Sequence, residues 1–243
     1  MLSFADEALV LTSLPHSENG AVVRFLTFTG GLRAGYVPGG RGKGKRALLH
    51  PGNRVALDLR ARAEGQLARA TVELAESRAL LAFAPMPAAM LGWLTELTAA
   101  ALAEAVPHPR LAEALDALLG GLSAGMDRDS ARAALSRYEL LLLEAEGFGL
   151  DLTACALGGP VADLAFVSPK TGRAVSRQMA AGQPWAPQLL ALPPFLLAGG
   201  PATPAEALQA LALSGHFLAR HWLSGERLVA ARARAIGSAR TAP

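Results

Sequence analysis

The stretch RVALDLRAR, Arg54–Arg62, decides the fold of the N-terminal part of the chain. Its apolar and charged residues alternate, with Val55, Leu57, Leu59 and Ala61 in one set and Arg54, Asp58, Arg60 and Arg62 in the other. Successive side chains of a β-strand point to opposite faces, so this alternation predicts a strand with one face in a core and one in solvent.

Four neighbouring segments have a similar character, and turn signals such as Gly30-Gly31 separate them. The expected strands are Ala5–Ser13, Ala21–Phe28, Gly31–Val37, Arg54–Ala63 and Leu67–Ser77. Five short strands in succession favour a small closed barrel. The OB-fold is the natural candidate, because it is five-stranded and binds nucleic acid. An SH3-like barrel would also fit this strand count.

After Phe83 the sequence becomes rich in Ala, Leu and Glu, which favour helices. The expected helices are Pro87–Ala105, Pro109–Leu122, Asp127–Glu146, Pro204–Leu223 and Gly225–Ile236. Within this region LAFVSPKTGRAV predicts a hairpin that turns at Ser168–Gly172, and Ser238–Pro243 is expected to be a frayed tail. The sequence therefore predicts an α+β fold, with a strand-rich domain at 1–80 and a helical domain at 81–243.

Composition limits the class of protein. The chain has 243 residues, 51% of them hydrophobic, but no stretch approaches the roughly 20 apolar residues that a membrane span needs. The segment Met1–Glu7 carries acids rather than a basic region, so no secretory signal is expected. Cys155 is the only cysteine, which excludes an internal disulfide and fits a reducing compartment. We expect a cytoplasmic protein.

Charge is distributed unevenly along the chain. The net charge is +3, but it is +5 over residues 1–63, −7 over 64–151 and +5 over 152–243. Basic ends and an acidic middle suggest distinct partners for distinct parts.

The segment GGRGKGKR, Gly39–Arg46, has three interpretations. Gly39, Gly44 and Lys45 fit most of a phosphate-binding P-loop. However, Arg46 replaces the Ser or Thr that binds magnesium, and Pro51-Gly52 leaves room for barely one helical turn. The second interpretation is a mobile basic loop that contacts nucleic-acid phosphates, and the third is a solvated loop that only aids solubility.

Positive residues surround this segment, and Asp58 is the only acid between positions 33 and 62. We expect the nucleic-acid contacts to be Arg33, Arg41, Lys43, Lys45, Arg46, Arg54, Arg60 and Arg62. The nearby aromatics, Phe25, Phe28 and Tyr36, support base stacking poorly, because Phe25 and Phe28 cannot both face outward on a regular strand. Contact with backbone phosphates is therefore expected to dominate.

Groups that could carry chemistry are scattered. Cys155 has no second cysteine beside it, whereas zinc takes about four ligands. His216 and His221 lie five positions apart, so they do not share a helical face well. No serine stands in a G-x-S-x-G context. We expect no catalytic residue, no metal and no cofactor, and hence no enzymatic activity, including ATP turnover dependent on Lys45.

Longer segments carry a resemblance to a known family. RYELLLLEAEGFGLDLTACALGG (Arg137–Gly159), followed by DLAFVSPKTGRAVS (Asp163–Ser176), resembles the RecO family of recombination and repair mediators. The run LPHSENGAVVRFLTFTGGLRAGYVPGGRGKGKR near the start is similar as well. The resemblance covers nearly the whole chain in order. It implies an N-terminal OB-fold, a helical domain and a zinc-finger-like module at about 152–182.

The resemblance also implies a function. It leads us to expect a DNA-binding mediator that binds single- and double-stranded DNA and promotes annealing. The protein should act with RecR and help to load RecA on DNA coated by single-strand-binding protein.

The zinc-finger-like module is expected to be degenerate. Many members of the resembling family carry a four-cysteine zinc site. Here Cys155 stands at the first ligand position, but Gly158 and Ser176 stand near where other cysteines are expected. We therefore predict no zinc, and a module held by its hairpin and by packing of Leu152, Leu164, Phe166 and Val175.

A second hypothesis is a protein-interaction adaptor whose contact with DNA is incidental. The acidic helical middle could offer a groove to a partner peptide. The resemblance suggests the acidic, apolar tail of single-strand-binding protein as that peptide. Such a tail needs positive charge at the groove, which could come from Arg110, Arg128, Arg132 or Arg137. Of these, Arg137 is the expected contact because it lies in the resembling segment.

Overall fold

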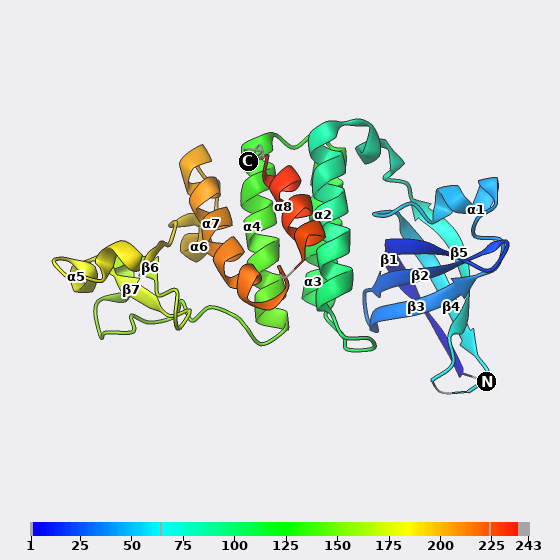
Figure 1. Ribbon diagram of the computed structural model, residues 1–243, viewed down its shortest axis with the longest axis horizontal. Coiled ribbons are helices and arrows are strands. Elements are labelled where there is room, and N and C mark those ends of the chain that lie inside the picture. Colours follow the sequence, from blue (N-terminus) through cyan, green and yellow to red (C-terminus); the bar gives the residue numbers. More distant parts are fainter. Residues whose placement is uncertain (1, 64, 224, 238–243) are drawn as a thin grey trace. The chain divides into compact units, whose positions relative to one another are not determined.

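The computed structural model describes residues 2–63, 65–223 and 225–237 (Figure 1). Contacts divide the chain into two compact units: Met1–Gly125 with Glu226–Pro243, and Met126–Gly225. The expected boundary at residue 80 marks where strands give way to helices, whereas these units are defined by packing.

The strands described in the first unit form a closed barrel in the order β1-β2-β3-β5-β4. They are β1 (Leu2–His16), β2 (Gly20–Thr27), β3 (Gly31–Val37), β4 (Arg54–Ala61) and β5 (Ala68–Glu76). Neighbours are antiparallel except for β3 and β5, which are parallel. The five predicted strands are confirmed. β1 is longer than predicted because its first half pairs with β4 and its second half with β2.

The barrel core follows the alternation of β4. Val55, Leu57 and Leu59 are buried, as their spacing predicts. Gly35 on β3 allows a close approach: a Cβ atom there would lie 2.8 Å from both the Cβ of Ala70 and the Cδ2 of Leu59. The glycine therefore lets the core side chains of β4 and β5 pack directly against the backbone of β3.

Three long helices belong to the same unit as the barrel. They are α2 (Pro85–Ala101), α3 (Pro109–Ser123) and α8 (Glu226–Ile236), with the short 3-10 helix η1 (Ala79–Phe83) before α2. α2 packs against α8 and β1. The predicted end of the first helix, at Ala105, is wrong: Leu102 is extended, and the Ala105 N–H donates to the Leu32 carbonyl at 2.9 Å. Pairing with the start of β3 thus replaces the last helical turn.

The second unit contains α4 (Arg128–Ala145) and α7 (Pro204–His221), which pack along each other. Asp127 caps α4, accepting hydrogen bonds from the N–H groups of Asp129 and Ser130 at 3.0 Å each. A buried hydrogen bond joins the two helices, because the Ser214 hydroxyl on α7 donates to the Glu139 carboxylate on α4.

A small sheet completes the second unit. Its described strands are β6 (Leu164–Val167), β7 (Ala174–Ser176) and β8 (Leu190–Ala191), in the order β7-β6-β8. The predicted hairpin is confirmed, and its turn closes with a hydrogen bond from the Gly172 N–H to the Ser168 carbonyl at 2.9 Å. The short elements η2 (Val161–Asp163), α5 (Arg177–Ala180), η3 (Ala186–Gln188) and α6 (Phe195–Ala198), like β8, have no periodic pattern that predicts them.

No helix in the described part of the chain is long and apolar enough to cross a membrane. The expected tail Ser238–Pro243 lies outside the described residues.

Candidate nucleic-acid interface

The glycine-rich segment joins β3 to β4 at one end of the barrel (Figure 1). Gly39 has a φ of +69°, and the Gly42 N–H donates to the Gly39 carbonyl at 2.9 Å. The helix α1 (Lys43–Leu48) follows, and Leu49 directly after it is buried in the barrel core. The prediction of a mobile loop is therefore wrong for its second half, Lys43–Arg46, which is helical. The buried Leu49 anchors this helix to the barrel.

The nucleotide-binding interpretation also needs a correction. The sequence predicts barely one helical turn after the glycines, whereas α1 has 6 residues. Arg46 nevertheless stands where a P-loop needs Ser or Thr to bind magnesium. The segment thus has a short helix but lacks that magnesium-binding hydroxyl.

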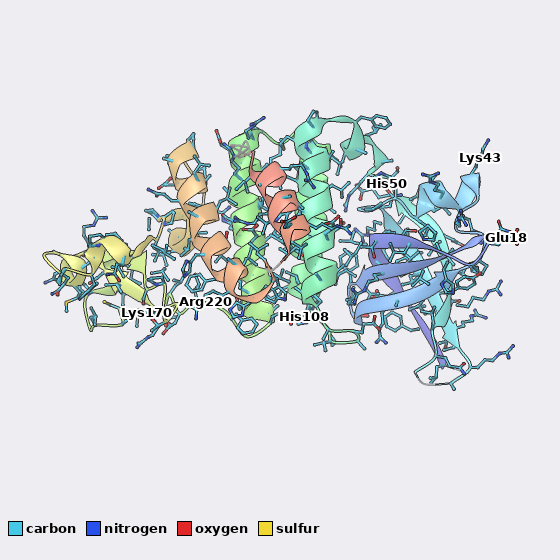
Figure 2. All side chains as sticks on the ribbon, viewed as in Figure 1. Glu18, Lys43, His50, His108, Lys170 and Arg220 are labelled. Atoms are coloured by element: carbon cyan, nitrogen blue, oxygen red, sulfur yellow. The ribbon has the colours of Figure 1, made fainter. Side chains whose placement is uncertain are left out.

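The positive side chains of this segment divide into two pairs. Arg41 donates to the Glu18 carbonyl at 3.0 Å and Lys45 to the Pro38 carbonyl at 2.9 Å, which fixes the segment to the barrel. Lys43 and Arg46 are exposed on α1. Figure 2 shows Lys43 pointing away from the barrel. The first turn of α1 carries no acidic residue, so its outer face is positive.

A second group of positive side chains lies where β4 meets β5. Arg60 and Arg62 are exposed, and Arg60 pairs with Asp58 at 2.8 Å. Arg69 on β5 lies directly opposite Arg60 and is also exposed. Sequence reasoning missed Arg69, although the alternation around it, with Ala70 and Val72 buried, carries the same signal as β4.

Contacts across the barrel link the two groups. Arg69 is the register partner of Tyr36 on β3, and the Tyr36 hydroxyl lies 3.3 Å from the Ser17 hydroxyl. Arg41 in turn donates to the Ser17 carbonyl at 3.4 Å. We call the resulting patch the basic surface; it comprises Arg41, Lys43, Lys45, Arg46, Arg60, Arg62 and Arg69.

Arg33 and Arg54, which the sequence also predicts to bind nucleic acid, instead contact other residues of the first unit. Arg54 forms ion pairs with Glu7 and, at 3.1 Å, with Asp116 on α3. The guanidinium of Arg33 lies 4.7 Å from the ring centre of Phe4. Both arginines are half-buried, so the basic surface is defined without them.

Arg137 on α4 lines a pocket of about 330 Å³ in the second unit. The other lining residues are Leu140, Leu141, Glu144, Leu150, Leu152 and Leu196. The guanidinium donates to the Gly200 carbonyl at 2.6 Å and lies 4.8 Å from the ring centre of Phe195. The residue that the sequence predicts for peptide binding therefore lines a pocket with five leucines, one arginine and one glutamate.

Sequence comparisons identify the family. The model described as Recombination protein O N terminal matches residues 1–78, and the one described as Recombination protein O C terminal matches residues 88–227. The chain belongs to the RecO family of DNA repair proteins.

Similar relatives carry the name DNA repair protein RecO. The protein from Phenylobacterium zucineum is 44% identical over 219 residues, which cover 89% of this chain and 88% of the relative. The protein from Rhodospirillum centenum is 41% identical over 243 residues, covering 99% and 92%. RecO proteins are non-enzymatic recombination mediators, so this chain works in DNA repair and recombination.

The resemblance to RecO raised the question of zinc, and the described residues do not fit a zinc site. No cluster of three or more His, Cys, Asp or Glu side chains occurs among them. Gly158 has no side chain to offer, and the Ser176 hydroxyl accepts a hydrogen bond from the Met179 N–H at 3.3 Å. Cys155 is the one thiol here, whereas a structural zinc takes about four ligands.

Cys155 is instead part of a hydrogen-bonded cluster. The Ser176 N–H donates to its sulfur at 3.3 Å. Burial raises the pKa of the Cys155 thiol, but hydrogen bonds from Ser176 and from the N–H groups of Leu157 and Gly159 outweigh burial and lower it to about 7. Around this cluster Leu164 and Val175 are buried, as predicted, while Leu152 and Phe166 are half-buried.

Proposed function

We propose that this RecO protein binds single- and double-stranded DNA through the basic surface of its barrel. The observation that carries the proposal is the chain of contacts that joins the α1 segment to β4 and β5. Arg69 is the register partner of Arg60 and Tyr36, and Tyr36 and Arg41 both contact Ser17. Clustered Lys and Arg side chains release counterions from DNA, which supplies affinity without sequence preference.

We further propose that residues 1–80 are an OB-fold. The five-stranded closed barrel supports this assignment, and OB-folds bind nucleic acid. In the region after it, residues 152–182 would be a degenerate zinc-finger-like module whose Cys155 cluster takes the place of a metal.

The barrel favours contact with phosphates over contact with bases. Phe25 is fully buried, Phe4 lies under Arg33, and the guanidinium of Arg54 is 5.0 Å from the ring centre of Phe28. Tyr36 packs over Gly20, where a Cβ atom would lie 2.2 Å from its ring. These aromatic rings are therefore buried or half-buried and already in contact with other groups, whereas the positive side chains of the basic surface are exposed.

Binding of this kind suits a mediator in the cytoplasm. Two DNA strands repel each other, and a surface that neutralises phosphates lowers the barrier to their annealing. By membership of the RecO family, we propose RecR and single-strand-binding protein as partners and RecA as the recombinase that is loaded indirectly.

A pair of matched double variants tests the proposal. Lys43→Ala/Arg46→Ala removes two exposed charges from α1, and Arg128→Ala/Arg234→Ala removes two exposed charges elsewhere. We expect the first to weaken binding of single- and double-stranded DNA roughly tenfold and to slow annealing, and the second to change little. Fluorescence anisotropy and a strand-annealing assay measure both effects. Equal effects of the two variants would remove α1 from the interface.

The Arg137 pocket favours a second function, the binding of a partner peptide. Its leucines suit apolar side chains, and Arg137 suits an acidic one. We expect a labelled peptide of the acidic, apolar tail of single-strand-binding protein to bind this pocket. Arg137→Ala should weaken the peptide about tenfold, the expected size for one charge-assisted contact, while Arg128→Ala should not.

Because Arg137 also holds the chain at Gly200, each variant needs a thermal melt beside the titration. Equal peptide affinities for Arg137→Ala and the wild type would sink the assignment.

A further inference from the structure

An aromatic cluster lies where α4 and α7 end in the second unit. The rings of Phe148 and His221 are stacked, with centroids 3.7 Å apart and planes at 20°. Trp222 meets the Phe148 ring edge-on, at 5.7 Å between centroids. Phe148 is 43% exposed, His221 is exposed and Trp222 is half-buried. We call these three rings the aromatic platform.

The end of α4 holds Phe148 in place. Gly147 has a φ of +83° and its N–H donates to the Glu144 carbonyl at 3.1 Å, while the Phe148 N–H donates to the Leu143 carbonyl at 2.7 Å. These two bonds form a Schellman motif, in which the residue at the position of Phe148 commonly packs back onto its own helix. Phe148 stacks on His221 of α7 and remains 43% exposed.

Positive groups adjoin the aromatic platform. Arg220 precedes His221 and donates to the Pro169 carbonyl at 2.8 Å and the Lys170 carbonyl at 3.5 Å, so the β6–β7 turn lies beside it. Figure 2 shows Lys170 and Arg220 next to each other. Burial and the neighbouring Arg220 lower the pKa of His221.

We propose that the aromatic platform stacks a base of single-stranded nucleic acid, with Lys170 and Arg220 contacting the flanking phosphates. The proposal rests on the proposed function and adds what the described part of the barrel lacks, an exposed Phe, Tyr or Trp side chain. Open aromatic faces beside Arg and Lys are the recurrent means by which proteins hold single strands without sequence preference. An acidic partner peptide would also meet the two cations, but the stacked rings favour a planar base.

The test compares two labelled strands of equal length, oligo-dT and an abasic strand with the same phosphates and no bases. The wild type should prefer oligo-dT. Stacking of one base is worth roughly five- to hundredfold in affinity, so Phe148→Ala should lose a factor of that size for oligo-dT and none for the abasic strand. Phe148→Trp should retain the preference. The control is Phe83→Ala, which removes an aromatic ring that is 83% exposed on η1.

The outcomes separate the two proposals. Failure of the wild type to bind either strand would overturn both the proposed function and this inference. Equal binding of the two strands, or a Phe148→Ala variant with an unchanged preference, would overturn only the inference. In that case the aromatic platform would be assigned to a protein partner. Thermal melts of each variant show whether the helix ends remain folded.

Discussion

Individual arginines of the barrel differ in what they can do for a ligand. Arg54 is matched by Glu7 and Asp116, and Arg33 lies over Phe4. A phosphate would have to compete with those existing contacts for the two guanidinium groups, which lowers its binding free energy. Lys43 and Arg46 carry no such penalty because they are exposed on α1. Exposure and partners, more than charge alone, therefore determine which residues can bind DNA.

Cys155 gives a pH-dependent prediction. Its thiol has a pKa near 7 in the folded protein, below the ordinary value of 9.0 that the unfolded chain retains. Since the folded state holds the thiolate better, its stabilising effect is absent below about pH 7, grows up to about pH 9 and is then constant. Wild type should gain unfolding free energy relative to Cys155→Ser over this interval.

Urea denaturation at pH 6, 7, 8 and 9 measures this difference, and Cys155→Val separates loss of the thiolate from loss of packing. A constant difference between wild type and Cys155→Ser across the four pH values would show that the Ser176 hydrogen bond does not favour the thiolate.

At the scale of elements, the strands were predictable and some helix ends were not. Alternation located β3 to the residue and the ends of β4 and β5 within about two residues, because one buried face leaves a period of two in the sequence. Helix α2 stops at Ala101 for a reason that lies far away in sequence, the pairing of Ala105 with Leu32. Such tertiary pairing leaves no local pattern.

In the candidate site, too, some residues could be predicted from local sequence and others depend on tertiary contacts. Charge density along the sequence located the basic segment and β4, and the alternation of β5 could have added Arg69. That Arg54 belongs to an ion pair with Asp116 on α3 could not be predicted, because the two residues meet only in the folded unit. The aromatic platform was missed for the same reason: Phe148 and His221 come from the ends of two different helices.

On the scale of the whole molecule, the uneven charge along the sequence corresponds to different structural elements. The net charge of +5 over residues 1–63 belongs to the barrel strands and α1, whose basic surface faces solvent. The net charge of −7 over residues 64–151 belongs mainly to helices. Two of its acids make contacts inside their own unit: Asp116 pairs with Arg78, and Glu139 accepts a hydrogen bond from Ser214. A modest net charge of +3 therefore conceals a barrel that is distinctly positive.

The most direct test of the central claim is the salt dependence of DNA binding. Each phosphate contact to a single strand contributes about 0.7 to the slope of log K against log salt concentration. Neutralising Arg41, Lys43, Lys45 and Arg46 together should therefore flatten the slope by about three units relative to wild type. A slope that stays unchanged in this variant, with the fold intact, would contradict the assignment of the basic surface as the DNA-binding site.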